Sequence, residues 1–169
     1  IMKTINILKK LIAIYYYLMI IGFIGAIISL PLLLFTNKSY EISFLGNEVD
    51  LVLLPLYKSL ITLLLVGTLY YLFFRAVRLI KRSLKDLSEG NYFSILVISN
   101  FKKIGILFLI CGFGSAVVKL VLGILLASIL KLGIDSSWVI FIIMGLFFLF
   151  LGEVFSKAGA LKQENDLTI

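Results

Sequence analysis

A single lysine, Lys119, lies near the middle of a long apolar stretch of the chain. An isolated cation is costly in the hydrocarbon of a bilayer, so such a residue usually faces other helices, a polar cavity or a ligand. At ~100° per residue, Lys119 shares a helical stripe about 80° wide with several small residues. The stripe consists of Gly105, Gly112, Ala116, Lys119, Gly123 and Ala127. Because small residues let helices approach closely in lipid, we expect a helix-packing face that turns Lys119 into the bundle or an oligomer interface.

Two interpretations of Lys119 follow from this position. In the first, its ammonium group meets backbone carbonyls, hydroxyl groups or an anionic ligand, because no carboxylate is expected at the same depth. In the second, the side chain snorkels through a cavity toward the outer interface and has no functional role. A catalytic lysine would need an acid or a nucleophile beside it, and the sequence offers neither.

Other residues that could support catalysis are scarce. The sequence contains no histidine and one cysteine, Cys111, which lies in an apolar stretch. This composition excludes a disulfide framework and most zinc chemistry. The chain also has no phosphate-binding loop, HExxH motif, nucleophile elbow or paired carboxylates. We therefore expect a protein that is not an enzyme and that binds neither a metal nor a cofactor.

The elements that position these residues are long apolar helices. Of the 169 residues, 62% are hydrophobic and 15% are charged, which leaves more apolar surface than a soluble domain can bury. A spanning helix needs roughly 20 apolar residues. Four stretches qualify, at about 7–35, 51–80, 104–130 and 138–155, and they lack the alternation of barrel strands. The sequence predicts an all-α membrane protein with four transmembrane helices in one domain, residues 1–169.

The lysines and arginines predict the orientation of these helices. The less basic side of the membrane would hold Lys38, Lys58 and Lys131. The more basic side would hold Lys3, Lys9, Lys10, Arg75, Arg78, Lys81, Arg82, Lys85, Lys102, Lys103, Lys157 and Lys162. By the positive-inside rule, both termini are expected in the cytoplasm of a bacterial cell, at its cytoplasmic membrane. The net charge of +7 is then mainly a topology signal with some attraction to anionic lipids, and no direct nucleic-acid binding is expected.

The segments between the helices differ on the two sides. On the outer side, residues 37–50 alternate in polarity and predict a hairpin that turns at Gly46-Asn47. On the inner side, helices two and three are expected to extend into the cytoplasm as a helical loop, residues 81–103. Gly90 is a natural helix stop there, and Ser94 is a natural cap of the next helix. This loop could lie along the headgroups or offer a surface to a partner.

The predicted cytoplasmic tail, residues 156–169, ends in a mixture of acidic and apolar residues. Its last residues are Glu164, Asn165, Asp166, Leu167, Thr168 and Ile169. Chain ends usually fray. This one nevertheless has the makeup of a short linear motif that docks in a groove.

Two segments of the chain resemble a known family. The ending Leu161–Ile169, after a helix that contains Gly152–Phe155, is similar to that of DUF2975, a family of bacterial four-helix integral membrane proteins. The middle segment Gly90–Ser94, followed by Asn100 and Lys102–Gly105, also looks like this family. The resemblance covers essentially the whole chain.

The resemblance implies a function. Members of the family are commonly encoded beside a very small helix-turn-helix regulator of the Cro/CI type. This implies a protein that anchors or sequesters such a regulator in response to a membrane signal, through the tail Glu164–Ile169 and through Tyr92 and Phe93. An alternative is a small transporter, channel or self-immunity subunit in which Lys119 lines an anion or lipid pathway. Assembly into a homo-oligomer or a larger complex is open in each case.

Overall fold

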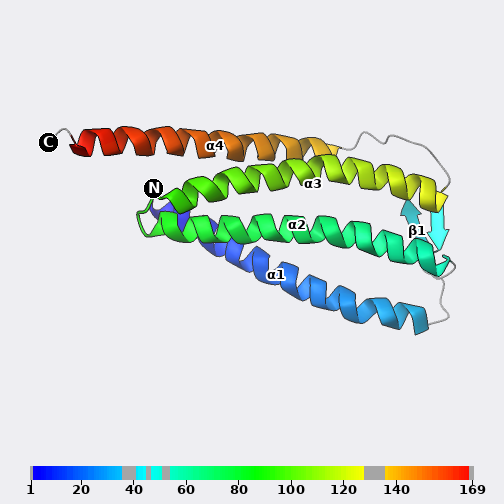
Figure 1. The fold of residues 1–169 in the computed structure, drawn as a ribbon. Helices are drawn as coiled ribbons and strands as arrows, with labels where there is room; N and C mark the ends of the chain where they lie inside the picture. The colour runs from blue at the N-terminus through cyan, green and yellow to red at the C-terminus, as the bar shows by residue number, and fades with distance from the viewer. Residues whose placement is uncertain (1, 36–40, 45–46, 51–53, 128–135, 168–169) are drawn as a thin grey trace.

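A computed structural model describes residues 2–35, 41–44, 47–50, 54–127 and 136–167 (Figure 1). Four long helices and one short hairpin make up these ranges. In chain order the elements are α1 (Met2–Phe35), β1 (Glu41–Phe44), β2 (Asn47–Asp50), α2 (Leu56–Ser88), α3 (Ile95–Ala127) and α4 (Ser136–Leu167).

All four helices are long and apolar enough to cross a membrane. The candidate spans are Lys3–Ser29, Leu56–Ser88, Ile95–Leu126 and Ser136–Asn165. This confirms the predicted class, an all-helical protein with four membrane-length helices. At ~1.5 Å per residue, a helix as long as α2 or α3 reaches about 50 Å, roughly 20 Å more than the hydrocarbon core of a bilayer. Both helices therefore continue beyond the hydrocarbon.

The helices lie side by side in the order of the chain. α1 packs on α2, α2 on α3, and α3 on α4, and the α3–α4 interface is the most extensive. Both ends of the chain and the α2–α3 connection lie at one end of the structure, whereas the hairpin lies at the opposite end (Figure 1). Elements that follow one another in the chain commonly lie side by side in this way.

Glycines bring the backbones of α3 and α4 together. A Cβ atom added at Gly105 would lie 2.8 Å from the carbonyl oxygen of Gly145, and one added at Gly145 would lie 2.9 Å from the carbonyl oxygen of Gly105. One heptad along each helix, Gly112 faces the main chain of Trp138 and Gly152 faces that of Lys102. Such close approaches to a neighbouring backbone are possible because the glycine on one helix has no side chain.

Phenylalanines fill the space beside the glycines. Phe108 of α3 stacks on Phe148 and Phe141 of α4, with ring centroids 5.7 and 6.0 Å apart. Phe73 of α2 meets Phe108 and Phe141 edge-on at 6.0 and 5.7 Å, so three helices share this cluster. Toward the chain termini, Phe101 continues the row on α3. Edge-on and offset rings attract each other through their quadrupoles, which favours this arrangement over loosely packed aliphatic groups.

The hairpin differs from the prediction by one residue. Phe44 pairs with Asn47, so Asn47 belongs to β2 and not to the turn predicted at Gly46-Asn47. In this register Val49 is buried, the neighbouring Glu48 is exposed, and β2 contacts α3. Because successive side chains of a strand point to opposite faces, Val49 is turned inward while Glu48 is turned outward.

The connection between α2 and α3 is compact and capped on both sides, as the residue types predict. Gly90 has a φ of 86°, a left-handed conformation that suits glycine. Its N–H donates to the carbonyl of Leu87, and the N–H of Asn91 donates to that of Asp86, which completes a Schellman ending of α2. At the start of α3, the backbone N–H of Val97 donates to Ser94 Oγ at 3.2 Å.

Candidate functional site

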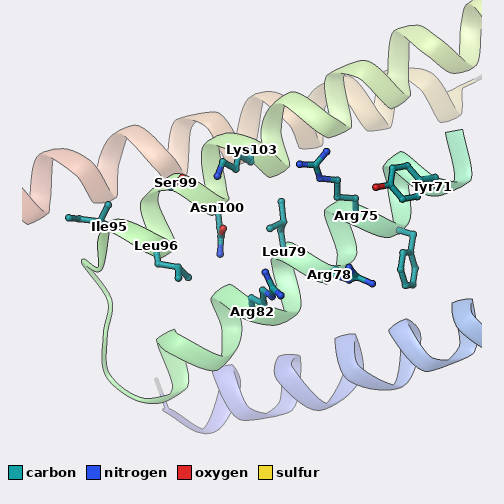
Figure 2. A pocket seen from close by; sticks show the side chains of 11 residues that line it. Tyr71, Arg75, Arg78, Leu79, Arg82, Ile95, Leu96, Ser99, Asn100 and Lys103 are labelled. Carbon is teal, nitrogen blue, oxygen red and sulfur yellow. The ribbon is translucent and has the colours of Figure 1, made fainter. Parts of the chain in front are cut away.

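A basic cleft opens between α2 and α3, toward the end of the structure that holds both chain termini (Figures 1 and 2). Its volume is about 680 Å³. Side chains from the two facing helices line it: Tyr71, Phe74, Arg75, Arg78, Leu79 and Arg82 from α2, and Ile95, Leu96, Ser99, Asn100 and Lys103 from α3. We refer to it below as the basic cleft.

The cations of the basic cleft come from a narrow stripe of α2. Arg78 and Arg82 follow Arg75 by three and seven positions, which places all three within about 60° of one another on the helix. Lys103 adds a fourth cation from α3, and all four side chains are exposed. None of the residues that line the cleft is acidic. The cleft therefore concentrates positive potential without a carboxylate of its own to neutralise it.

Asn100 supplies an unusual neutral group to the same cleft. The residue is 7% exposed, and its amide nitrogen Nδ2 is buried without a hydrogen-bond partner. Figure 2 shows this side chain pointing from α3 toward α2, near Leu79 and Arg82. A buried donor without an acceptor costs about 1–3 kcal/mol, so such groups are rare in folded proteins. Ser83 Oγ is also buried without a partner, but Ser83 does not line the cleft.

The depth of the basic cleft follows from the helix rise. Along α2, Arg75 lies about 28 Å from Leu56 at ~1.5 Å per residue, which is close to the thickness of the hydrocarbon core. Tyr71 and Phe74 come just before Arg75, at the depth where aromatic rings form interfacial belts. Arg75, the first arginine of the cleft, thus lies about one hydrocarbon thickness from the start of α2.

Next to the basic cleft, lysines also take part in the contact between α1 and α2. Lys81 Nζ lies 4.4 Å from the ring centroids of both Tyr16 and Tyr17. Tyr16 in turn stacks on Phe74 at 5.0 Å, and Lys9 Nζ donates to Ser88 Oγ at 2.9 Å. These cation–π and hydrogen-bond contacts hold α1 against α2 at the headgroup level. Lys81 thus helps to hold α1 against α2, and it does not line the basic cleft.

Lys119 lies far from the basic cleft. It is half-buried in the other half of α3, about 24 Å from Lys103 along the helix at ~1.5 Å per residue. Lys119 has an interaction partner in the structure. The structure therefore does not combine Lys119 with the cations at the opposite end of α3.

The other residues of the predicted packing stripe lie at several places along α3. Gly105 and Gly112 face α4, as described above, and Gly123 is buried. Ala116 is half-buried. Ala127 is the last residue of α3, and its side chain lies outside the described part of the structure.

The predicted partner-binding residues separate into two groups. Phe93 packs on α4, with its ring centroid 6.0 Å from that of Phe155, and Tyr92 is half-buried beside it in the chain. Glu164 and Asn165 are exposed near the end of α4 and have interactions of their own. Asp166 and Leu167 continue the helix, but their side chains are not described, and Thr168 and Ile169 lie outside the described residues.

The sequence did not reveal the basic cleft because its signals pointed elsewhere. The arginines from Arg75 to Arg82 are explained by the positive-inside rule, which says nothing about whether they face another helix. Asn100, a polar residue within an apolar stretch, was the available signal, since such residues rarely face lipid. Within the described ranges, no cluster of His, Cys, Asp and Glu residues could hold a metal ion.

Four helices that are long and apolar enough to cross a membrane define the class, an all-helical membrane protein. A comparison with known families gives the family. The model of the family described as "Protein of unknown function (DUF2975)" matches residues 5–169, and the chain belongs to this family. No curated protein and no solved structure matches the chain.

Proposed function

We propose that this protein is a non-enzymatic bacterial membrane protein that holds a small helix-turn-helix transcription regulator of the Cro/CI type at the cytoplasmic membrane. The observation that supports the proposal best is the exposed end of α4, which continues past its contacts with α3. The resemblance to DUF2975 supplies the class of partner, because its members are commonly encoded beside such regulators.

The distribution of charge supports a cytoplasmic position for this end. The N-terminal turns of α1, the last turns of α2 and the first turns of α3 carry most of the lysines and arginines, and they meet at the end where α4 finishes (Figure 1). The positive-inside rule assigns such an end to the cytoplasm. A cytoplasmic regulator could then reach α4 without crossing the bilayer.

The end of α4 leaves the bundle at a definite point. Gly159 is the last glycine of α4 that lies against the α2–α3 connection, where a Cβ atom would lie 3.5 Å from that of Phe93. Beyond it, residues 160–165 are exposed, and Leu161 is 61% exposed. Figure 1 shows α4 running past the other helices at this end. An exposed helical end is a suitable ligand for a groove on a partner.

The chemistry of this end suits a regulator that binds DNA. Glu164 and Asp166 are acidic, whereas Leu167 and Ile169 are apolar. A DNA-binding protein is basic near its binding surface. Acidic groups would attract such a surface, and the apolar residues would supply the buried contacts.

Co-purification tests the proposal. The regulator encoded beside the gene is expected to elute with the full-length protein in detergent and to be lost when Glu164 to Ile169 are deleted. A variant with the same residues in scrambled order keeps the length and charge of the tail, and it should also lose the regulator if a specific motif is recognised. Size-exclusion chromatography checks that the bundle is intact in each variant. Equal recovery of the regulator from all three proteins would refute the role of the tail.

A further inference from the structure

We propose that the basic cleft is a binding site for the phosphate-bearing headgroup of an anionic phospholipid. This site is separate from the tail of α4, and the inference does not depend on the function proposed above. It is supported by the charge of the cleft, by the buried amide of Asn100 and by the depth of the cleft in the membrane.

The charge of the cleft favours an anion. Arg75, Arg78, Arg82 and Lys103 surround one cavity that has no acidic residue in its lining, so the four cations repel one another until an anion enters. Arginine is the side chain best suited to phosphate, because its planar guanidinium group donates two parallel hydrogen bonds to two oxygens. Arg75 and Arg82 lie on the same face of α2, two turns or about 10 Å apart along the helix, so a headgroup between them faces a long side chain at each end.

Asn100 gives the site a donor that diffuse attraction would not need. Its Nδ2 is buried without a partner, in a residue that lines the cleft. An amide group has two N–H donors, and a phosphate oxygen is an acceptor that would satisfy one of them. A ligand in the cleft therefore removes the cost of the unpaired donor, which a loose layer of counterions at the surface would not do.

The apolar part of the cleft indicates a lipid as the source of the phosphate. Tyr71 and Phe74 line the cleft on the side of Arg75 that is nearer the middle of α2 and the hydrocarbon. A soluble phosphate gains nothing from these groups. A phospholipid places glycerol and the first methylenes of its chains beside them, and the cleft already lies at headgroup depth.

Native mass spectrometry of the purified full-length protein in detergent tests the site. The protein is titrated with phosphatidylglycerol and, separately, with zwitterionic phosphatidylcholine. We expect the wild type to retain phosphatidylglycerol in preference to phosphatidylcholine. At about fivefold per basic residue, Arg75→Gln with Arg82→Gln should weaken the retention of phosphatidylglycerol roughly 30-fold.

Two further variants separate a built site from general attraction. Lys10→Gln with Lys85→Gln removes the same charge from exposed side chains at this end of the molecule that do not line the cleft, so it should leave retention unchanged. Asn100→Leu keeps every charge and the approximate volume, and it should weaken retention severalfold because the amide donor is lost.

The outcomes that would overturn the proposal are distinct. If the two double glutamine variants lost phosphatidylglycerol equally, the lipid would be held by the general positive charge of this end and not by the cleft. If a folded Asn100→Leu variant retained the lipid as well as the wild type, the phosphate would not lie beside Asn100. In a third arm, inorganic phosphate is added at millimolar concentration. If inorganic phosphate displaces phosphatidylglycerol and binds the lipid-free protein as tightly as the lipid does, the cleft is a site for soluble phosphate and the lipid assignment is wrong.

Discussion

Replacing Gly105 by alanine should separate α3 from α4. The new Cβ atom would lie 2.6 Å from Leu149 Cγ and 2.8 Å from the carbonyl oxygen of Gly145. A leucine side chain can change its rotamer to relieve the first contact. The second obstacle belongs to the backbone, so it can be relieved only by moving one helix away from the other.

The magnitude follows from two opposing effects. Overpacking of this kind costs about 1–3 kcal/mol. Alanine is a better helix former than glycine by about 1 kcal/mol, which offsets part of that cost. Because the obstacle is main chain, we expect Gly105→Ala to lower the free energy of unfolding by about 1–2 kcal/mol. The reciprocal variant Gly145→Ala should behave similarly, and the double variant should lose less than the sum because one separation relieves both contacts.

The chain contains matched controls for this experiment. A Cβ atom at Gly25 in α1 or at Gly67 in α2 would meet nothing within 4 Å. Gly25→Ala and Gly67→Ala make the same chemical change without the clash. They should leave the free energy of unfolding unchanged or raise it by up to about 1 kcal/mol.

Unfolding in mixed micelles with increasing dodecyl sulfate gives the measurement. The sequence has one tryptophan, Trp138 near the start of α4, and its carbonyl oxygen would lie 3.1 Å from a Cβ atom at Gly112. Tryptophan fluorescence therefore reports on the α3–α4 interface, and circular dichroism reports on helix content. If Gly105→Ala unfolded at the same detergent composition as Gly25→Ala, the inference that the backbones of α3 and α4 are in close contact at Gly105 would be refuted.

Two other predictions concern Ser94 at the start of α3 and the half-buried Lys119. Ser94→Ala removes the hydrogen bond to the backbone N–H of Val97 and should cost about 1 kcal/mol of stability in the same unfolding assay, whereas Ser94→Asp should retain most of it; equal loss in both would show that the cap does not stabilise α3. Lys119→Met should leave recovery of the regulator unchanged, because Lys119 lies at the opposite end of α3 from the end of α4. Loss of the regulator in an intact Lys119→Met protein would instead link the membrane span to partner binding and would favour a role for Lys119 in sensing or transport.

The sequence predicted the features that depend on one helix at a time. The length of the apolar runs determines the four helices because the thickness of the bilayer sets a minimum span. The Schellman ending at Gly90 and the cap at Ser94 follow from the local chemistry of those residues.

Features that depend on two elements were less accessible. The stripe of small residues marks a close-packed face of α3, but only the structure shows that Gly105 meets Gly145. The place of Asn47 in β2 was also missed, because its preference for turns is a local signal that does not reveal its pairing with Phe44. The basic cleft requires the relative rotation of α2 and α3, and that rotation is set by side-chain packing such as that of Phe73 on Phe108.

The backbone contact between Gly105 and Gly145 also has a mechanical consequence. At Gly105 and Gly145 no side chain separates the two main chains, so α3 and α4 cannot slide or roll past each other without collision. The two helices therefore move together as one rigid unit. The α2–α3 interface, where the basic cleft lies, is less extensive than the α3–α4 interface. A headgroup that draws the arginines of α2 toward Asn100 would tilt α3 and α4 together relative to α2. Because α4 continues beyond Gly159, its exposed end lies farthest from the contacts with α3 and would be displaced most by such a tilt.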